Sequence, residues 1–205
     1  MALLSIPNTT LKLTMSKNDP LNTNILTSES KIIYTIETIL HHRPSWGSKR
    51  STTVTRGNIG GGNIGGGDSR LQVGVIEWPA NPADRPSVIV GTRSVEMTKT
   101  GLYTAPEMFQ ASDGQLYEWQ IRDYRSHLVP LKTPKSQAYV ATFLTSSSRP
   151  SFFSPRKVHT ASLFVPPEGI AILDDIIVTF VYFESQWRER ERAKARRWDT
   201  PFGMG

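Results

Sequence analysis

The stretch GIAILDDIIVTFVYFESQWRERERAKARR, residues 169–197, decides the fold. Its first half is almost entirely apolar, its second half is almost entirely charged, and no Gly or Pro interrupts it after its first residue. A segment that is apolar on every side has to be enclosed by other structure or by lipid. The apolar run, residues 170–183, is only 14 residues long and contains Asp174 and Asp175, whereas a membrane-spanning helix needs about 20 apolar residues. We therefore expect a buried core element and no transmembrane segment.

Propensity alone leaves the secondary structure of this stretch open. Residues 176–183, IIVTFVYF, are β-branched or aromatic and would suit a strand, and periodicity does not separate a buried strand from a buried helix in so short a run. Three features favour a helix. No breaker separates the run from the charged segment, Asp174 and Asp175 stand where carboxylates stabilise a helix N-terminus, and two acid–base pairs beyond residue 183 have helical spacing. The sequence predicts one helix at about residues 172–196.

The chain before residue 166 consists of short β-type runs separated by turns. Asp113-Gly114 fits the type I′ turn of a hairpin, and residues 41–49, which contain Pro44 and Gly47, are expected to form a loop. So many short strands indicate a barrel or sandwich, and a closed sheet would enclose an apolar helix without leaving strand edges exposed. We expect a mainly β protein, a closed or nearly closed antiparallel β-barrel of about 10–12 strands around the C-terminal helix. The expected strands and hairpin are residues 10–15, 31–39, 51–56, 71–78, 87–90, 93–98, 109–121, 127–129, 138–144 and 157–165.

We expect one domain, residues 1–197, followed by a disordered tail, residues 198–205. Residues 57–68, GNIGGGNIGGGD, contain Asn-Ile-Gly-Gly-Gly twice and formally match the dinucleotide pattern G-x-G-x-x-G. That pattern has meaning only between a strand and a helix, and here a strand-like run, residues 71–78, follows. The stretch is better interpreted as a flexible loop insertion, and no cofactor is expected.

Composition narrows the chemistry and the location. The chain has no cysteine, which excludes disulfides, thiolate zinc sites and cysteine nucleophiles. The N-terminus lacks both the basic region and the long apolar run of a signal peptide, so we expect an intracellular, cytoplasmic protein. The formal charge of +6 permits anionic partners without identifying one.

No catalytic motif is present in the sequence. The four histidines, His41, His42, His127 and His159, form no H-x-x-x-H pair, and there is no G-x-S-x-G motif. Electrostatics at a helix N-terminus explains Asp174-Asp175 more simply than acid–base catalysis does. We therefore expect a protein that is not an enzyme and has no metal site. The alternative is an enzyme whose site consists of dispersed polar residues that no motif reveals.

Several segments resemble, in the same order, a fungal domain of unknown function (number 6593 in that series). The most specific match is LDDIIVTFVYFE, residues 173–184, and the similarity extends from about residue 10 to residue 192. That domain is similar to the tubby C-terminal class, in which strands close around a central apolar helix, and the wider class includes phosphoinositide binders and scramblase-like proteins. The resemblance implies the same barrel, but it assigns no binding residue here. The other matching segments are residues 22–23, 31–38, 52–56, 75–78, 109 and 113–119.

A basic segment follows the apolar run and carries the functional hypothesis. Trp187 and Trp198 flank it, and a basic helix with aromatic neighbours can lie on an anionic membrane. We expect a binding module for anionic phospholipid headgroups or for a protein partner at a membrane surface. Nucleic acid is not the expected partner, and the sequence does not fix the oligomeric state. The competing interpretation is a solvated helix with its own ion pairs. The candidate contact residues are Arg188, Arg190, Arg192, Lys194, Arg196 and Arg197.

Overall fold

The computed structural model of the chain describes residues 9–43, 47–57, 70–81, 83–101, 106–131, 139–145 and 160–198. Thirteen strands and two helices lie in these ranges, one strand more than the upper end of our prediction. The elements are β1 (Leu11–Met15), β2 (Thr23–Leu26), β3 (Ile32–Arg43), β4 (Gly47–Arg56), β5 (Leu71–Trp78), β6 (Ser87–Val90), β7 (Arg93–Val95), β8 (Thr98–Lys99), β9 (Glu107–Gln110), β10 (Leu116–Arg122), β11 (Arg125–Pro130), β12 (Ala141–Leu144), β13 (Ser162–Val165), α1 (Pro167–Ile170) and α2 (Leu173–Trp198).

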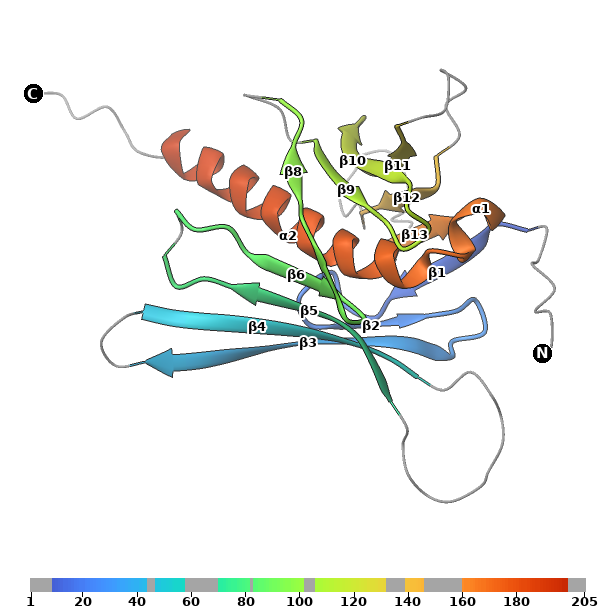
Figure 1. The fold of residues 1–205 in the computed structure, drawn as a ribbon, viewed down its shortest axis with the longest axis horizontal. Helices are drawn as coiled ribbons and strands as arrows, with labels where there is room; N and C mark the ends of the chain where they lie inside the picture. Colours follow the sequence, from blue (N-terminus) through green and yellow to red (C-terminus); the bar gives the residue numbers. More distant parts are fainter. Residues whose placement is uncertain are drawn as a thin grey trace, which may run out of the picture.

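All the strands belong to one antiparallel sheet that curves around α2 (Figure 1). Its order is β7-β6-β5-β4-β3-β2-β1-β13-β12-β11-β10-β9-β8. Every pair of neighbours is therefore consecutive in the chain except β1 and β13, which pair with Leu13 opposite Leu163. The mainly β, antiparallel part of our prediction is confirmed.

The two edges of this sheet, β7 and β8, are separated in the chain only by Glu96 and Met97. Three peptide units link Val95 to Thr98, so their Cα atoms lie at most about 11 Å apart. No ladder joins β7 to β8 in the described ranges, and the sheet is not closed into a barrel. The predicted closure is therefore unconfirmed. The two strands have three and two residues, which leaves little backbone for a closing ladder.

The apolar half of α2 forms the centre of the core. Every side chain from Ile176 to Phe183 is buried. Phe180 packs against Trp119 of β10 and Phe143 of β12, with ring centroids 5.9 and 4.6 Å away. Side chains buried on every face require cover on every face, and the curved sheet supplies it (Figure 1). The prediction of one helix at about residues 172–196 is confirmed to within two residues at each end, and its apolar first half is the buried part.

On the opposite side, α2 approaches β5 so closely that only glycine fits at residue 74. A Cβ atom on Gly74 would lie 2.4 Å from Val178 Cγ2 and 2.9 Å from the carbonyl oxygen of Ile89. Real Cβ atoms essentially never make contacts this short. The absence of a side chain on Gly74 therefore allows α2 to pack this close to β5.

The N-terminus of α2 is held from two sides by its acidic pair, which lies in the first turn as predicted. Asp174 accepts a hydrogen bond from the Tyr34 hydroxyl (2.6 Å) and pairs with Arg56 (2.8 Å). Asp175 pairs with Arg93 and accepts a bond from the Ser112 hydroxyl at 2.6 Å. The two carboxylates thus complement the helix dipole and also attach the helix to both halves of the sheet.

Three predictions about strands need correction. The strand predicted at residues 93–98 is interrupted at Glu96 and Met97, and its two parts, β7 and β8, lie at opposite edges of the sheet. The sequence analysis missed β2, a four-residue strand whose residues alternate between buried and half-buried. The loop predicted for residues 41–49 is mostly strand, because β3 and β4 form a long hairpin in which His41 pairs with Lys49 and Arg43 with Gly47. Pro44 lies outside the described residues, between the two strands. Ladder pairing outweighs the turn signal of Gly47 here.

The turn prediction for Asp113-Gly114 is also wrong in type. Only Gly114 has a positive φ, of 79°, and the N–H of Gly114 donates to the carbonyl of Ala111. This is a three-residue loop with glycine in the left-handed region. The two-residue turn with both φ angles positive is Asp123-Tyr124, at 49° and 60°, between β10 and β11. Apart from Gly57, the Gly-rich insertion at residues 57–68 lies outside the described part of the chain, as do residues 199–205 of the predicted tail.

Candidate functional site

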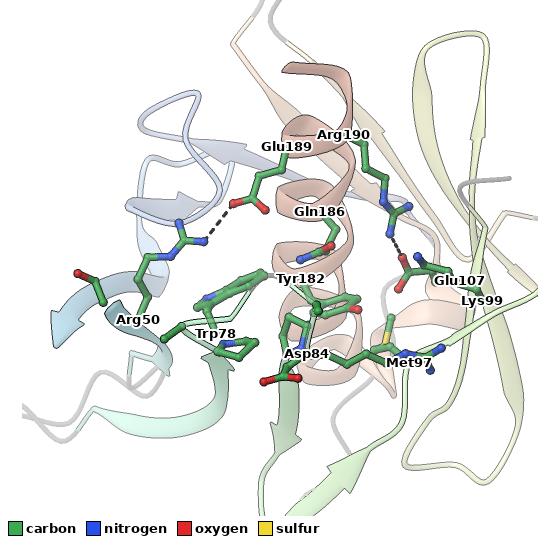
Figure 2. Close-up of a pocket in the computed structure, with 16 residues that line it drawn as sticks. Arg50, Trp78, Asp84, Met97, Lys99, Glu107, Tyr182, Gln186, Glu189 and Arg190 are labelled. Carbon is green, nitrogen blue, oxygen red and sulfur yellow. Dashed lines mark hydrogen bonds and ion pairs between the residues drawn. The ribbon is translucent and has the colours of Figure 1, made fainter. Parts of the chain in front are cut away.

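A cleft of about 480 Å³ opens beside the second half of α2 (Figure 2). One wall comes from the ends of β4 and β5 and the connection that follows β5. The other comes from β8, β9 and the Met97 link between the two sheet edges. The cleft therefore lies where the sheet is not closed.

An aromatic stack forms one side of the cleft. The rings of Trp78 and Tyr182 lie nearly parallel, at 9°, with centroids 6.0 Å apart. The Trp78 indole N–H donates to the Thr52 hydroxyl at 2.8 Å, which fixes the ring. The guanidinium of Arg50 lies 5.5 Å from the Trp78 ring and pairs with Glu189 of α2 at 3.0 Å. This wall is therefore rigid and partly apolar, with a charged pair above it.

Glu107, in the β9 wall of the cleft, is completely buried and lies beside Tyr182 (Figure 2). One of its carboxylate oxygens, Oε1, pairs with Arg190 of α2. The other, Oε2, has no hydrogen-bond partner among the described residues. Burial, followed by the charge of the Glu107 carboxylate and a hydrogen bond to it, raises the pKa of the Tyr182 hydroxyl. The cleft thus holds a buried acceptor beside a neutral phenol.

The rim of the cleft is charged and exposed. Arg85 and Lys99 contribute cations and Asp84 a carboxylate, and all three side chains are exposed. Lys99 is the cross-strand partner of Glu107, so the two side chains leave the same face of the sheet. In total, four cationic side chains and three carboxylates line the cleft, which makes it slightly positive.

The structure divides the six predicted lipid-contact residues into two groups. Arg188 is largely buried and donates to Glu184 at 2.7 Å and to the backbone carbonyl of Asn18 at 2.8 Å. Arg190 faces the cleft and pairs with Glu107. Arg188 thus connects α2 to the segment between β1 and β2, and Arg190 connects it to β9. Glu184 and Arg188, which are four residues apart on the helix, form the ion pair that their spacing predicts.

The second group occupies the C-terminal end of α2 (Figure 1). Arg192, Lys194 and Arg196 are exposed there. Lys194 pairs with Glu191 at 2.7 Å, as its spacing predicted, and remains 69% exposed. Arg197 belongs to the helix, but its side chain lies outside the described part. The charged surface next to the cleft is therefore made by residues 192–196.

The two histidines whose side chains are described, His41 and His127, do not converge on a site. His41 is exposed. His127 is buried, its Nδ1 atom lies 3.0 Å from the Thr142 hydroxyl, and its ring stacks on Tyr139 at 4.1 Å. The side chains of His42 and His159 lie outside the described residues. Within those residues, no group of three or more His, Asp or Glu side chains is placed to hold a metal ion.

A second cavity, of about 470 Å³, lies at the other end of α2. Asp174, Asp175 and Arg56 line it, and these charges already pair with each other or with Arg93. In the part of the chain that the structure describes, no helix has both the length and the apolarity needed to cross a bilayer.

Sequence reasoning missed the residues that make the cleft. Glu107 stands two residues before Phe109, so period-two alternation places this carboxylate on the apolar face of β9. An acidic residue on the inward face of a strand was the signal that could have pointed to the cleft. It was missed because the predicted hairpin began at residue 109, after Glu107. Nothing in the sequence brings β9 next to α2, because that contact depends on the curvature of the whole sheet.

These features define a class: a curved antiparallel sheet built around a C-terminal helix, with a charged cleft where the edges of the sheet approach each other. The chain belongs to a family of unknown function (DUF6593), whose model matches residues 18–189. The match covers most of the resemblance described above, and it ends before the exposed basic end of α2. No curated protein and no solved structure matches the chain.

Proposed function

We propose that the protein is a non-enzymatic, single-domain binding module that attaches to anionic phospholipid at a membrane surface. The observation that carries the proposal is the end of α2, where Arg192, Lys194 and Arg196 are exposed on a helix that has left the core. Such a helix can approach a flat anionic surface without any change in the fold. Each exposed Lys or Arg near such a surface contributes about 1 kcal/mol of attraction.

The neighbouring residues support this geometry. Arg188 and Arg190 attach the base of the exposed segment to Glu184 and Glu107, both buried. Trp187, half-buried on the same helix, adds an aromatic side chain where the helix leaves the sheet. The exposed charges are therefore held at a fixed orientation to the body of the protein, which limits the entropy lost on binding.

The family resemblance adds support of a different kind. The tubby-like class combines a nearly closed barrel with a central helix, and some of its members bind phosphoinositides. We propose that this chain has the same nearly closed barrel around α2 and acts at the cytoplasmic face of a membrane. No binding residue of that class is transferred to this chain.

The alternative proposal is an enzyme with a site of dispersed polar residues. The cleft is its natural place, because it has a buried carboxylate beside a tyrosine. Two of the three carboxylates in the cleft are each paired with an arginine, Glu107 with Arg190 and Glu189 with Arg50. Paired carboxylates suit binding and positioning better than proton transfer, so we favour the binding module.

Co-sedimentation with liposomes tests the proposal. Wild type should bind vesicles that contain an anionic lipid and should not bind neutral vesicles. The binding should weaken as the salt concentration rises, because exposed charges are screened beyond about 8–10 Å. Changing Arg192, Lys194, Arg196 and Arg197 together to Gln should weaken binding by up to about 4 kcal/mol. The melting temperature should stay unchanged, since the described members of this set lie outside the core.

A control variant with the same loss of charge separates a specific surface from net charge. Lys12, Lys17, Arg122 and Arg125 are exposed and lie on other parts of the sheet or its connections. Changing these four to Gln should leave most of the binding intact. Equal weakening in both quadruple variants, or no binding by wild type at low salt, would contradict the proposal.

A further inference from the structure

Two cations of the cleft have no counter-charge. Four cationic side chains line the cleft, and two of them, Arg50 and Arg190, pair with carboxylates of the same cleft. The other two, Arg85 and Lys99, are exposed and form no ion pair or side-chain hydrogen bond in the described part of the chain. The remaining carboxylate, Asp84, is exposed and pairs with neither. The cleft therefore presents two unpaired cations, one on each of its walls.

Neutral hydrogen-bond donors face the same space. Gln186 of α2 lines the cleft (Figure 2), and its amide group has no hydrogen-bond partner among the described residues. The backbone of β8 supplies another donor. The N–H of Thr100 donates to the carbonyl of Pro106 on the β9 side. Since alternate residues of an antiparallel strand direct their N–H groups to opposite sides, the N–H of Lys99 points away from β9.

The side of β8 that faces away from β9 is the gap in the sheet. If the register of β6 and β7 continued, with Val88 opposite Val95, it would place residues 84 and 86 opposite residues 99 and 97. It does not continue, and Pro86 has no N–H with which to extend it. The N–H of Lys99 therefore has no strand partner on this side and points toward the cleft, which residues 84–86 also line.

The space beside these donors suits a small organic group. Burial raises the pKa of the Tyr182 hydroxyl, and the charge of Arg85 acts against this rise, which places the guanidinium near the inner wall. Pro79, Pro86 and Met97 add apolar surface. The volume of about 480 Å³ lies within the range of small-molecule sites, roughly 300–1,000 Å³.

A phosphate monoester matches this set of donors. Hydrogen bonds from Arg and Lys to phosphate are charge-assisted and are among the strongest in proteins. A monoester has three terminal oxygens and a charge of about −1.5 to −2 at pH 7, which suits two unpaired cations and two neutral donors. A phosphate diester has a single charge and two terminal oxygens, so it leaves part of the set unused.

We propose that the cleft binds a phosphate monoester, with its phosphate group between Arg85 and Lys99. The Gln186 amide and the N–H of Lys99 donate to the remaining oxygens. This site does not depend on the attachment to membranes proposed above. The phosphate belongs either to a lipid that ends in a monoester or to a free phosphate compound, because both present the same group to the cleft.

Titration calorimetry with soluble probes tests the site without a membrane. Glycerol 3-phosphate, a monoester, should bind wild type in a saturable way and at least about tenfold more tightly than glycerophosphoglycerol, a diester. Arg85→Gln and Lys99→Gln should each weaken the binding of the monoester at least about tenfold, and Lys99→Arg should keep most of it. Lys17→Gln and Arg122→Gln, which remove exposed cations outside the cleft, are the matched controls and should change nothing.

The melting temperatures of these variants should equal that of wild type, since the substituted side chains in the cleft are exposed and unpaired. A loss of binding then reports on the site and not on the fold. Equal affinity of wild type for the monoester and the diester, or no saturable binding of the monoester, overturns the proposal. So does wild-type affinity in either Arg85→Gln or Lys99→Gln.

Liposomes identify the carrier of the phosphate and separate this proposal from the previous one. Vesicles that contain phosphatidic acid, a monoester, or phosphatidylglycerol, a diester, are compared at equal surface charge. A preference of wild type for phosphatidic acid that disappears in Lys99→Gln identifies a lipid. Equal binding to both lipids, together with saturable binding of glycerol 3-phosphate, identifies a free phosphate compound. If wild type binds the liposomes but not the soluble monoester, the cleft proposal fails and the membrane proposal stands, and the reverse result removes only the membrane proposal.

Discussion

At the scale of single residues, Phe180 best shows what the core requires. Its side chain is fully buried between Trp119 and Phe143. We expect Phe180→Ala to lower the free energy of unfolding by about 3–5 kcal/mol and Phe180→Asp by more than about 4 kcal/mol, because a buried unpaired charge is among the most damaging changes. Urea unfolding measures both. Tyr124→Asp, at a residue that is 80% exposed, is the control, and an unchanged midpoint for Phe180→Asp would refute the buried position.

His127 predicts how stability depends on pH. Burial, and next the nearby charges of Arg122 and Arg125, lower its pKa below the ordinary 6.5. As pH falls through 6.5, the unfolded chain therefore binds a proton that the folded protein does not, so stability decreases in that direction and is unaffected above it. Urea unfolding between neutral pH and about pH 5 should show this loss, and His127→Gln should show a smaller one. An identical slope in both proteins would contradict the assignment.

At the scale of elements, the packing of α2 on β5 depends on Gly74. A Cβ atom at that residue would collide with Val178 and with the backbone of β6. We expect Gly74→Ala to destabilise the protein by about 1–3 kcal/mol, the usual cost of overpacking. Gly57→Ala is the matched control, since its Cβ atom would lie 3.4 Å from the Ile32 carbonyl oxygen, an ordinary van der Waals contact. Thermal melting of both variants measures the difference, and equal melting temperatures would show that the helix can move away from the strand at little cost.

The elements also show where sequence reasoning succeeds. The helix could be predicted despite its β propensity, because a continuous segment, an acidic first turn and helical pair spacing all agreed. Most strands could be predicted from alternation and turn residues. Turn types were harder to predict from the sequence, since Asp123-Tyr124 adopts two positive φ angles without the usual glycine. In that hairpin, the pairing of β10 with β11 fixes the turn, and long-range pairing cannot be read from two residues.

At the scale of the whole molecule, the Gly-rich insertion should be dispensable. Arg56 and Leu71 are direct partners in the ladder between β4 and β5, so a two-residue Asn-Gly turn can join them in place of residues 57–70. Loop length changes the free energy of closure by only about 0.6 kcal/mol per doubling. We expect the shortened protein to unfold within about 1 kcal/mol of wild type in urea. A loss of cooperative unfolding would show that the insertion contributes to the fold.

The candidate site could be predicted only in part, and the reason also lies at this scale. The sequence located a basic segment, but it could not show that Arg188 and Arg190 are attached to buried carboxylates while residues 192–196 remain exposed. The cleft combines side chains from residue 48 to residue 190. Their meeting depends on how far a thirteen-strand sheet curves, and no local pattern encodes that curvature.

The position of the core helix at the end of the described chain has a consequence for biosynthesis. A ribosome makes β1–β13, the strands of the described residues, before α2, and at about 5–20 residues per second the delay between β1 and α2 is on the order of ten seconds. During that delay the inward faces of the strands have nothing to pack on, so the nascent chain has no native core. It resembles an aggregation-prone intermediate that chaperones would protect. Formation of the native core therefore waits for the synthesis of α2, and a product that stops before residue 173 lacks the helix on which the strands pack.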